Sequence, residues 1–142
     1  MSLLPREIQE HYSKSQEWQR LSSDQGELER LRTHAIFSRE LPPAPAVVFD
    51  VGGGAGVHAF WLARQGYQVH LFDPVELHLD QARSHSAASG IAVASIACAD
   101  ARMLEIASAS ADAVLMLGPL YHLTDHRDRI QALREGRRIL RP

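Results

Sequence analysis

The pattern of apolar positions changes near residue 46, and this change divides the chain into two predicted parts. Residues 1–45 place apolar side chains at helical spacing, whereas residues 46–142 show short apolar runs that alternate with helical stretches. Three prolines just before residue 46 separate the two patterns, because proline lacks a backbone donor and ends a helix. The sequence therefore predicts an N-terminal helical cap over 1–45 and one α/β domain over 46–142.

Two helices are expected in the cap. The stronger pattern places Leu28, Leu31 and Ala35 on one helical face. A capping box formed by Ser22 with Gln25, or by Asp24 with Glu27, would begin this helix. A weaker helical pattern covers residues 8–21.

The second part alternates predicted strands with predicted helices. Glycines close two of these helices, and Thr124 or Asp125 can cap the last one. Alternation of this kind favours parallel pairing with right-handed crossovers, and hence a doubly wound, mainly parallel open sheet. The apolar stripe of the last helix is expected at Ile130, Leu133 and Leu140. The four strands are predicted within 46–49, 67–73, 91–99 and 111–117, and the helices over 57–64, over 74–89 and from about 124 onward.

A glycine cluster at residues 52–56 follows the first predicted strand directly and precedes a helix. Such a turn lets the backbone approach a ligand, and the first N–H groups of the helix favour an anionic group. Asp73 closes the second strand, where a carboxylate can accept hydrogen bonds from the ribose hydroxyls of an adenosine. These features predict a nucleotide-like ligand without choosing it, because residues 54–59 also satisfy the dinucleotide pattern G-x-G-x-x-G/A.

Asp50, two residues before the first glycine, favours one class of ligand. The pyrophosphate of a dinucleotide would bring negative charge into this turn, and the Asp50 carboxylate would repel it. An ammonium group would be attracted instead. S-adenosylmethionine carries an ammonium group, a carboxylate, a ribose and an adenine, so Asp50, the glycine loop and Asp73 form a chemically coherent set for this ligand.

Four segments in register resemble class I S-adenosylmethionine-dependent methyltransferases, over about residues 46 to 142. The resemblance implies a Rossmann-like fold and transfer of the sulfonium methyl group to an acceptor, with S-adenosylhomocysteine as product. The matching segments are Asp-Val-Gly-Gly-Gly-Ala-Gly at 50–56, Leu-Phe-Asp at 71–73, Ala-Asp-Ala-Arg at 99–102, and the fourth strand with its following loop at 110–123.

The resemblance also implies roles for individual residues. In the family pattern, the glycine loop holds the methionine end, the second strand holds the ribose, and the loop at 99–102 meets the adenine. Tyr121 and His122 fall in the loop after the fourth strand, where the acceptor would approach, and His122 is a candidate general base. The cofactor-binding residues implied are Asp50, Gly52, Gly54, Gly56, Asp73, Pro74, Asp100, Ala101, Leu117 and Gly118.

Composition excludes several other classes of protein. Fifteen basic and seventeen acidic side chains give a net charge of −2, which argues against nucleic-acid binding over the whole chain. Cys98 is the only cysteine, so neither an internal disulfide nor a cysteine-rich metal site is expected. His122 and His126 have no further ligands in the pattern, so no metal site is predicted. The chain contains neither an apolar run of about 18 residues nor a signal-peptide pattern, so we expect a cytoplasmic protein without a membrane partner.

Members of the resembled family continue through a Gly-Gly turn and three more strands, whereas this sequence stops at Pro142. We therefore expect a truncated form with the cofactor-binding half of the fold, inactive if the absent part holds the acceptor site. The fourth strand would be an unpaired edge that a second copy could pair with.

Several alternatives remain open at this stage. The acceptor is not identified by the sequence, and a small molecule is favoured. One alternative is the cofactor domain of an NAD(P)-dependent oxidoreductase, and another is a methyltransferase-like module that binds without catalysis. An RNA methyltransferase that uses the arginines near the C-terminus is a further alternative.

Overall fold

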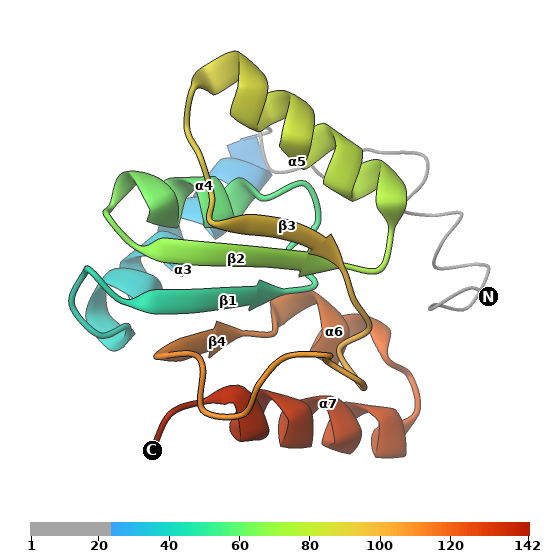
Figure 1. Ribbon diagram of the computed structural model, residues 1–142. Helices are drawn as coiled ribbons and strands as arrows, with labels where there is room; N and C mark the ends of the chain where they lie inside the picture. Colours follow the sequence, from blue (N-terminus) through green and yellow to red (C-terminus); the bar gives the residue numbers. More distant parts are fainter. Residues whose placement is uncertain (1–23) are drawn as a thin grey trace.

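A four-stranded parallel sheet forms the centre of the computed structural model, which describes residues 24–142 (Figure 1). The strand order is β3-β2-β1-β4, and each neighbouring pair is parallel. This arrangement confirms the predicted Rossmann-like sheet. The strands are β1 (Val47–Val51), β2 (Gln68–Asp73), β3 (Ser95–Cys98) and β4 (Ala113–Leu115).

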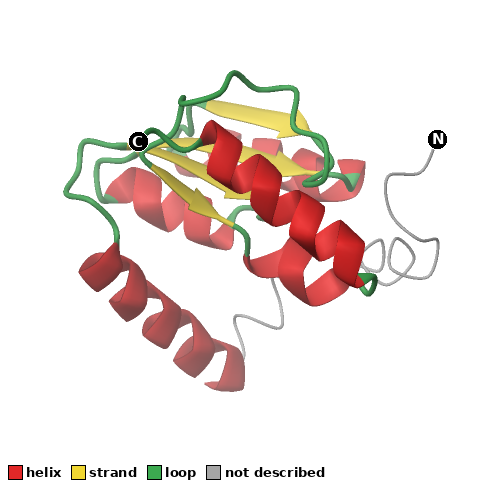
Figure 2. Ribbon diagram, turned by 90° about the horizontal axis from the view of Figure 1, so that it is seen from below, coloured by secondary structure: helices red, strands yellow, loops and turns green. Residues whose placement is uncertain are grey.

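Helices cover both faces of this sheet (Figure 2). One core contains Val48 of β1 together with Phe60 and Leu62 of α4, and the N-terminal helix and α5 also contribute to it. The other core contains Phe49 and Val51 of β1 and the buried face of α7. Neighbouring residues of β1 thus enter opposite cores, as the two-residue period of a strand requires. The helices are α3 (Asp24–Glu40), α4 (Val57–Arg64), α5 (Glu76–Ser89), α6 (Leu117–His122) and α7 (His126–Ile139).

Two details of the C-terminal region differ from the sequence prediction. Residues 117–122 form the short helix α6 and not a loop, with Pro119 in its first turn, where proline is tolerated. The predicted stripe of α7 is also wrong, because Ala132, Gly136 and Ile139 are its buried residues. Small residues let α7 pack closely on side chains of β4 and just after it: a Cβ atom added at Gly136 would lie 3.0 Å from Met116 Cε and 3.8 Å from Val114 Cγ1. The buried face of α7 is therefore the one whose small residues allow close packing, and not the one with the larger number of bulky apolar residues.

The outer edge of β4 is partly paired within the chain. An isolated parallel bridge joins Ala111 to Leu140, and the Arg141 N–H donates to the Ala111 carbonyl at 2.8 Å. Beyond this bridge, the structure pairs β4 with β1 alone among residues 24–142.

The helix α3 packs on α4 through aromatic rings and not through its leucines. Leu28 and Leu31, which the apolar pattern placed on one helical face, are 61% and 55% exposed. His34 stacks on Trp61 with ring centroids 4.0 Å apart and planes 11° apart, and its Nε2 lies 3.2 Å from His58 Nδ1. Imidazole stacking therefore holds this part of the cap to the sheet domain. The helix predicted over 8–21 lies outside the described residues, as does Ser22.

This packing predicts a loss of stability in acid. Burial, followed by the charges of His58 and Arg30, lowers the pKa of His34 from 6.5 to about 4. Between these two pH values His34 binds a proton in the unfolded chain but not in the folded chain. The free energy of unfolding should therefore fall as the pH drops from about 6.5 towards 4. His34→Phe keeps a ring against Trp61 and removes the titration. Its melting temperature should decline less than that of the wild type between pH 7.5 and pH 5.

Circular dichroism melts at the two pH values provide the measurement. His126→Phe, at an exposed position at the start of α7, is the matched control and should behave as the wild type does. Parallel declines in His34→Phe and the wild type would contradict the assignment.

Candidate functional site

The glycine loop between β1 and α4 is fixed to the end of β2. The N–H groups of Gly52 and Gly53 both donate to the Phe72 carbonyl, at 2.7 and 3.1 Å. Gly52, Gly54 and Gly56 have φ angles of +74°, +59° and +91°. These left-handed conformations strain other residue types, so the spacing of the three glycines follows from the path of the turn.

Asp50 lies buried beneath this loop, with only 3% of its surface exposed. A Cβ atom added at Gly53 would fall 2.5 Å from Asp50 Oδ2, so only a glycine backbone can lie this close to the carboxylate. Asp50 Oδ2 has no hydrogen-bond partner within the described part of the chain. Burial, and secondarily the charge of Asp73, raises the pKa of Asp50 to about 7. A buried acceptor without a donor is costly, and a donor or cation from a ligand would satisfy it.

Asp73, at the end of β2, is buried and accepts three hydrogen bonds from the protein. Its Oδ2 accepts from the Gly54 N–H at 2.9 Å. Its Oδ1 accepts from the Val75 N–H at 2.9 Å and lies 3.1 Å from His78 Nδ1. One side chain thus connects the glycine loop, the end of β2 and the beginning of α5.

Asp100 follows β3 and is held by Arg102. The Arg102 Nη2 donates to Asp100 Oδ2 at 2.7 Å, and the Arg102 backbone N–H donates to Oδ1 at 2.8 Å. The same guanidinium reaches Asp128 of α7 at 3.0 Å. Burial would raise the pKa of Asp100, but the hydrogen bonds and charge of Arg102 outweigh it, so the net pKa lies below the usual range. Asp100 is therefore an ionised acceptor in a fixed position.

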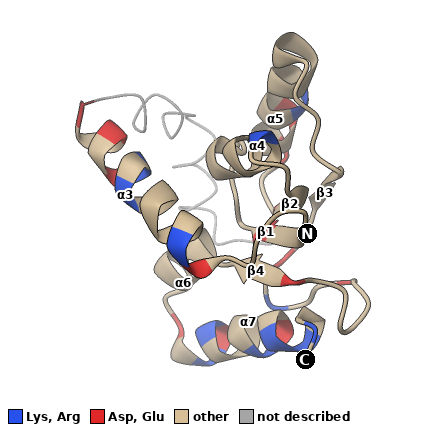
Figure 3. Ribbon diagram, turned by 90° about the vertical axis from the view of Figure 1, so that its left-hand side faces the viewer, with Lys and Arg blue, Asp and Glu red and all other residues tan. Residues whose placement is uncertain are grey.

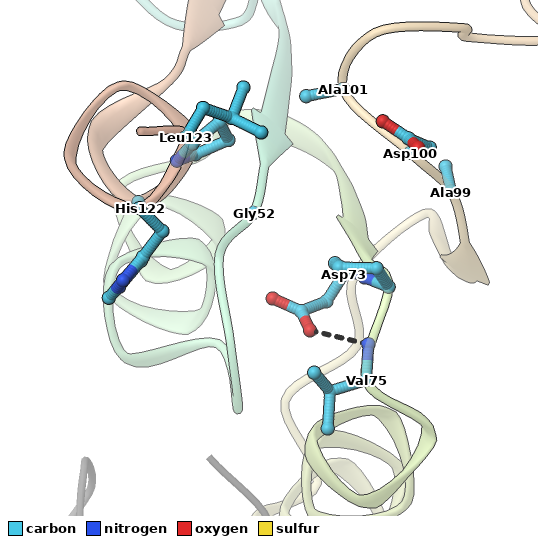
Figure 4. Close-up of a pocket in the computed structure, with 11 residues that line it drawn as sticks. Gly52, Asp73, Val75, Ala99, Asp100, Ala101, His122 and Leu123 are labelled. Atoms are coloured by element: carbon cyan, nitrogen blue, oxygen red, sulfur yellow. Dashed lines mark hydrogen bonds between the residues drawn. The ribbon is translucent and has the colours of Figure 1, made fainter. Parts of the chain in front are cut away.

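A pocket lies at the carboxyl ends of the strands, where ligands of open α/β sheets bind. It is an open concavity of about 480 Å³, a volume that includes the solvent at its mouth. Figure 4 shows Asp73 and Val75 on one side, His122 and Leu123 on another, and Ala99 to Ala101 along a third. The lining residues are Gly52, Asp73, Pro74, Val75, Ala99, Asp100, Ala101, Gly118, Pro119, His122 and Leu123.

Helix α6 closes one side of this pocket by packing against the glycine loop. A Cβ atom added at Gly118 would lie 2.8 Å from the Gly52 carbonyl oxygen, and one added at Gly52 would lie 2.5 Å from Pro119 Cδ. Glycine at both positions therefore permits the contact. The Leu123 N–H donates to the Pro119 carbonyl at 2.9 Å and completes the turn that brings His122 to the pocket.

The structure brings most of the predicted site residues to this pocket, and it places the remaining ones elsewhere. Asp50, Gly54 and Gly56 lie under or within the loop without lining the pocket. Gly56 begins α4, where an added Cβ would lie 2.8 Å from Phe60, so packing explains this glycine. Leu117 is exposed, and Tyr121 is 83% exposed and also absent from the lining. The lining residues predicted in advance are Gly52, Asp73, Pro74, Asp100, Ala101, Gly118 and His122.

Sequence reasoning missed some residues of the site. The pocket lining also includes four residues that are adjacent in sequence to predicted site residues, namely Val75, Ala99, Pro119 and Leu123. His78 was missed altogether, although a histidine five residues after an acidic strand end, in the first turns of the next helix, is a usable signal.

Residues 24–142 contain neither a metal-binding cluster nor a membrane-spanning helix. No group of three or more histidine, cysteine, aspartate or glutamate residues there is arranged to hold a metal ion. No helix in the same range is both long enough and apolar enough to cross a membrane.

Comparison with known proteins identifies the family. The family model described as "Methyltransferase domain" matches residues 48–142, and the chain therefore belongs to this family, as the four segments predicted. A search of the curated proteins found no match.

Solved structures show the same fold. The PH0226 protein of Pyrococcus horikoshii is 23% identical with a TM-score of 0.79, over 94% of this chain and 61% of that one. An S-adenosylmethionine-dependent methyltransferase from Methanosarcina mazei is 23% identical with a TM-score of 0.69, over 75% and 52%. Phosphoethanolamine N-methyltransferase 1 of Haemonchus contortus, solved with phosphoethanolamine and S-adenosylhomocysteine, is 24% identical with a TM-score of 0.71, over 96% and 29%. The chain thus spans less than two thirds of the length of each.

The burial of Asp50 predicts that this residue destabilises the protein in the absence of ligand. With a pKa near 7 in the folded state against 3.8 ordinarily, the folded chain holds a proton that the unfolded chain loses. The contribution of Asp50 to stability should therefore fall as the pH rises from about 4 to 7. Asp50→Asn removes this titration. Its melting temperature should exceed that of the wild type at pH 8 by on the order of 5 °C.

The two proteins should melt much closer together at pH 4.5, where Asp50 is protonated in the folded state. Differential scanning fluorimetry without ligand gives both values. An Asp50→Asn variant that is no more stable than the wild type at pH 8 would refute the prediction.

Proposed function

We propose that this chain binds S-adenosylmethionine and forms the cofactor-binding part of a methyltransferase. The observation that carries the proposal is the buried Asp50 Oδ2, which lies directly beneath the backbone of the glycine loop and has no hydrogen-bond partner in the described range 24–142. The ammonium group of the methionine moiety is a donor and a cation, and it would satisfy both the hydrogen bond and the charge. Membership in the methyltransferase-domain family supports the same ligand.

The remaining residues fit the other parts of this ligand. Asp73 lines the pocket at the end of β2, where its carboxylate can accept from ribose hydroxyls. Asp100 lines the pocket after β3 and is ionised, so it can accept from the amino group of adenine. Each carboxylate already accepts bonds from the protein, and these bonds fix its position before the ligand arrives.

S-adenosylmethionine, when bound, would supply a methyl group activated by the sulfonium: the acceptor would bond to the methyl carbon as the carbon–sulfur bond breaks in line, with S-adenosylhomocysteine as the leaving group. The residues of the chain position the two reactants and exclude water, which is where the catalytic effect of such a site arises. His122 reaches the pocket from α6 and would take a proton from an acceptor nitrogen or oxygen. Tyr121 could contact an acceptor only outside the pocket, since its side chain points largely into solvent.

A small molecule is the acceptor class that we favour. The nematode protein in the comparison was solved with phosphoethanolamine, a small acceptor, and it shares the fold of this chain. An RNA acceptor is less well supported, because several arginines of the C-terminal region are engaged internally. Arg138 binds Glu135 and the carbonyls of Leu104 and Ile106, and Arg141 binds Asp112. Figure 3 shows basic and acidic residues mixed along α7.

A nicotinamide-dependent oxidoreductase is the main alternative, and Asp50 argues against it. A pyrophosphate at the glycine loop would lie over the buried Asp50 carboxylate, whose Oδ2 has no donor among residues 24–142. A module that binds the cofactor without catalysis would use the same contacts, and only an assay of methyl transfer separates it from an enzyme.

We also infer a cytoplasmic location, because the one cysteine is a free and exposed thiol that suits a reducing compartment. Pairing of a second copy along the β4 edge remains part of the proposal.

The first prediction of this proposal concerns ligand selection. At a hundredfold excess over its dissociation constant, a ligand stabilises the folded state by about 2.7 kcal/mol. S-adenosylhomocysteine should therefore raise the melting temperature by several degrees, whereas NADH should leave it unchanged. A shift with NADH alone would overturn the proposal in favour of the oxidoreductase.

The second prediction isolates the role of Asp50. Asp50→Asn should weaken S-adenosylhomocysteine at pH 8 by about tenfold or more, because the ammonium group loses its charged partner. 5′-Methylthioadenosine, which lacks that ammonium group, should bind both proteins alike. Isothermal titration calorimetry with the two ligands gives the comparison. Equal losses for both ligands would place Asp50 outside the contact with the methionine end.

A further inference from the structure

His78 is a buried residue behind the pocket that none of the roles above explains. It lies in the first turns of α5 with 1% of its surface exposed. Its Nδ1 lies 3.1 Å from Asp73 Oδ1. Asp73 lines the pocket and His78 does not. Any effect of His78 on a ligand in this pocket must therefore pass through Asp73.

The direction of this hydrogen bond follows from the other partners of Asp73. The N–H of Gly54 donates to one carboxylate oxygen and the N–H of Val75 donates to the other. Asp73 must accept on both oxygens, which an ionised carboxylate does. His78 Nδ1 therefore carries a hydrogen atom and donates it to Asp73 Oδ1.

The position of His78 also connects it to the glycine loop. A Cβ atom added at Gly54 would have His78 Nδ1 as its nearest neighbour, at 3.9 Å. His78 thus lies beneath the point where the loop meets Asp73. Two of the three donors to Asp73 are backbone groups, so His78 is the donor that side-chain substitution can remove without altering the carboxylate itself.

A further requirement arises from burial. The Asp73 carboxylate is buried, so its oxygens need donors in fixed positions. The N–H groups of Val75 and His78 meet on Oδ1, while that of Gly54 meets Oδ2. The His78 N–H therefore helps to hold the carboxylate in one rotamer.

We propose that His78 is a positioning residue, which holds the Asp73 carboxylate ready to accept from the vicinal hydroxyls of a ribose and so contributes to selectivity for ribosides over deoxyribosides. This inference rests on the proposed function, since it takes the ligand to be S-adenosylmethionine or its product. His78 acts on the ribose through Asp73 and contacts no reacting atom.

Two amide variants test whether a donor is needed at the Nδ1 position of His78 or at the Nε2 position. The amide nitrogen of His78→Asn lies close to the position of Nδ1, whereas that of His78→Gln lies close to the position of Nε2. The binding constant of each variant is measured by calorimetry for S-adenosylhomocysteine and, by competition, for its 2′,3′-dideoxy analogue, which lacks both ribose hydroxyls. Circular dichroism establishes that each variant is folded.

His78→Gln and His78→Leu should weaken S-adenosylhomocysteine by about tenfold, while His78→Asn should stay within about threefold of the wild type. The dideoxy analogue should bind all of these proteins within about twofold, because it does not use Asp73. His70→Leu is the matched control. It removes a half-buried imidazole whose Nδ1 lies 2.7 Å from Ser95 Oγ, and it should change neither affinity.

The outcomes separate this inference from the proposed function. Wild-type protein that fails to bind S-adenosylhomocysteine would overturn the proposed function, and the inference with it. Wild-type binding that His78→Gln leaves unchanged would overturn the inference alone. Equal losses for the riboside and the dideoxy analogue would also overturn it, because a general packing role lowers both. If His78→Leu does not fold, the comparison of the Asn and Gln variants decides.

Discussion

The hydrogen bonds to the Asp73 carboxylate are the contacts on which the site depends. They join the glycine loop to the end of β2 and to the beginning of α5, three segments that are separated along the chain. Each donor is a group that would otherwise need a partner, since Gly54 lies in a turn and Val75 precedes a helix whose first N–H groups have no intrahelical acceptor. Asp73 therefore stabilises the loop and also presents its carboxylate to the pocket. A substitution at Asp73 would alter both functions at once, whereas His78 offers a way to alter only one.

The sequence predicted the parts of the fold that depend on local pattern. Buried parallel strands read as apolar runs, and the glycine turn at Gly52 to Gly56 requires left-handed backbone angles, so β1, the loop and α4 could all be located. The misses depend on tertiary contacts. α7 buries Ala132 and Gly136 because its backbone approaches β4, a preference for small residues that a search for large apolar side chains cannot detect. In α3, ring stacking on Trp61 selects His34 over the leucines.

The site residues divide in the same way, into those that the local sequence pattern predicts and those that depend on tertiary contacts. Residues at strand ends, such as Asp73 and Asp100, could be predicted because the carboxyl ends of parallel strands meet at one edge of the sheet. The partners of these carboxylates were not predicted. Arg102 contacts Asp100 through the turn after β3, and His78 contacts Asp73 through the path of α5. The loop predicted after β4 is a helix, since the contact of Gly118 and Pro119 with Gly52 needs a compact turn. Tyr121 consequently points to solvent while His122 reaches the pocket.

Two carboxylates, Asp73 and Asp100, line the pocket, and a third, Asp50, lies buried beneath the glycine loop in a different electrostatic state. Asp73 and Asp100 are satisfied by donors of the protein, so a neutral hydroxyl or amino group adds a bond to an acceptor that is already in place. Asp50 lacks a partner for Oδ2 within the described residues, and its raised pKa reports the resulting cost of its charge. A ligand that brings a cation to Asp50 removes this cost on binding, whereas a neutral or anionic ligand does not. Under the proposed function, discrimination for a zwitterionic amino-acid end would arise from the Asp50 charge that the described residues leave unsatisfied, and the fixed carboxylates would supply recognition of the nucleoside.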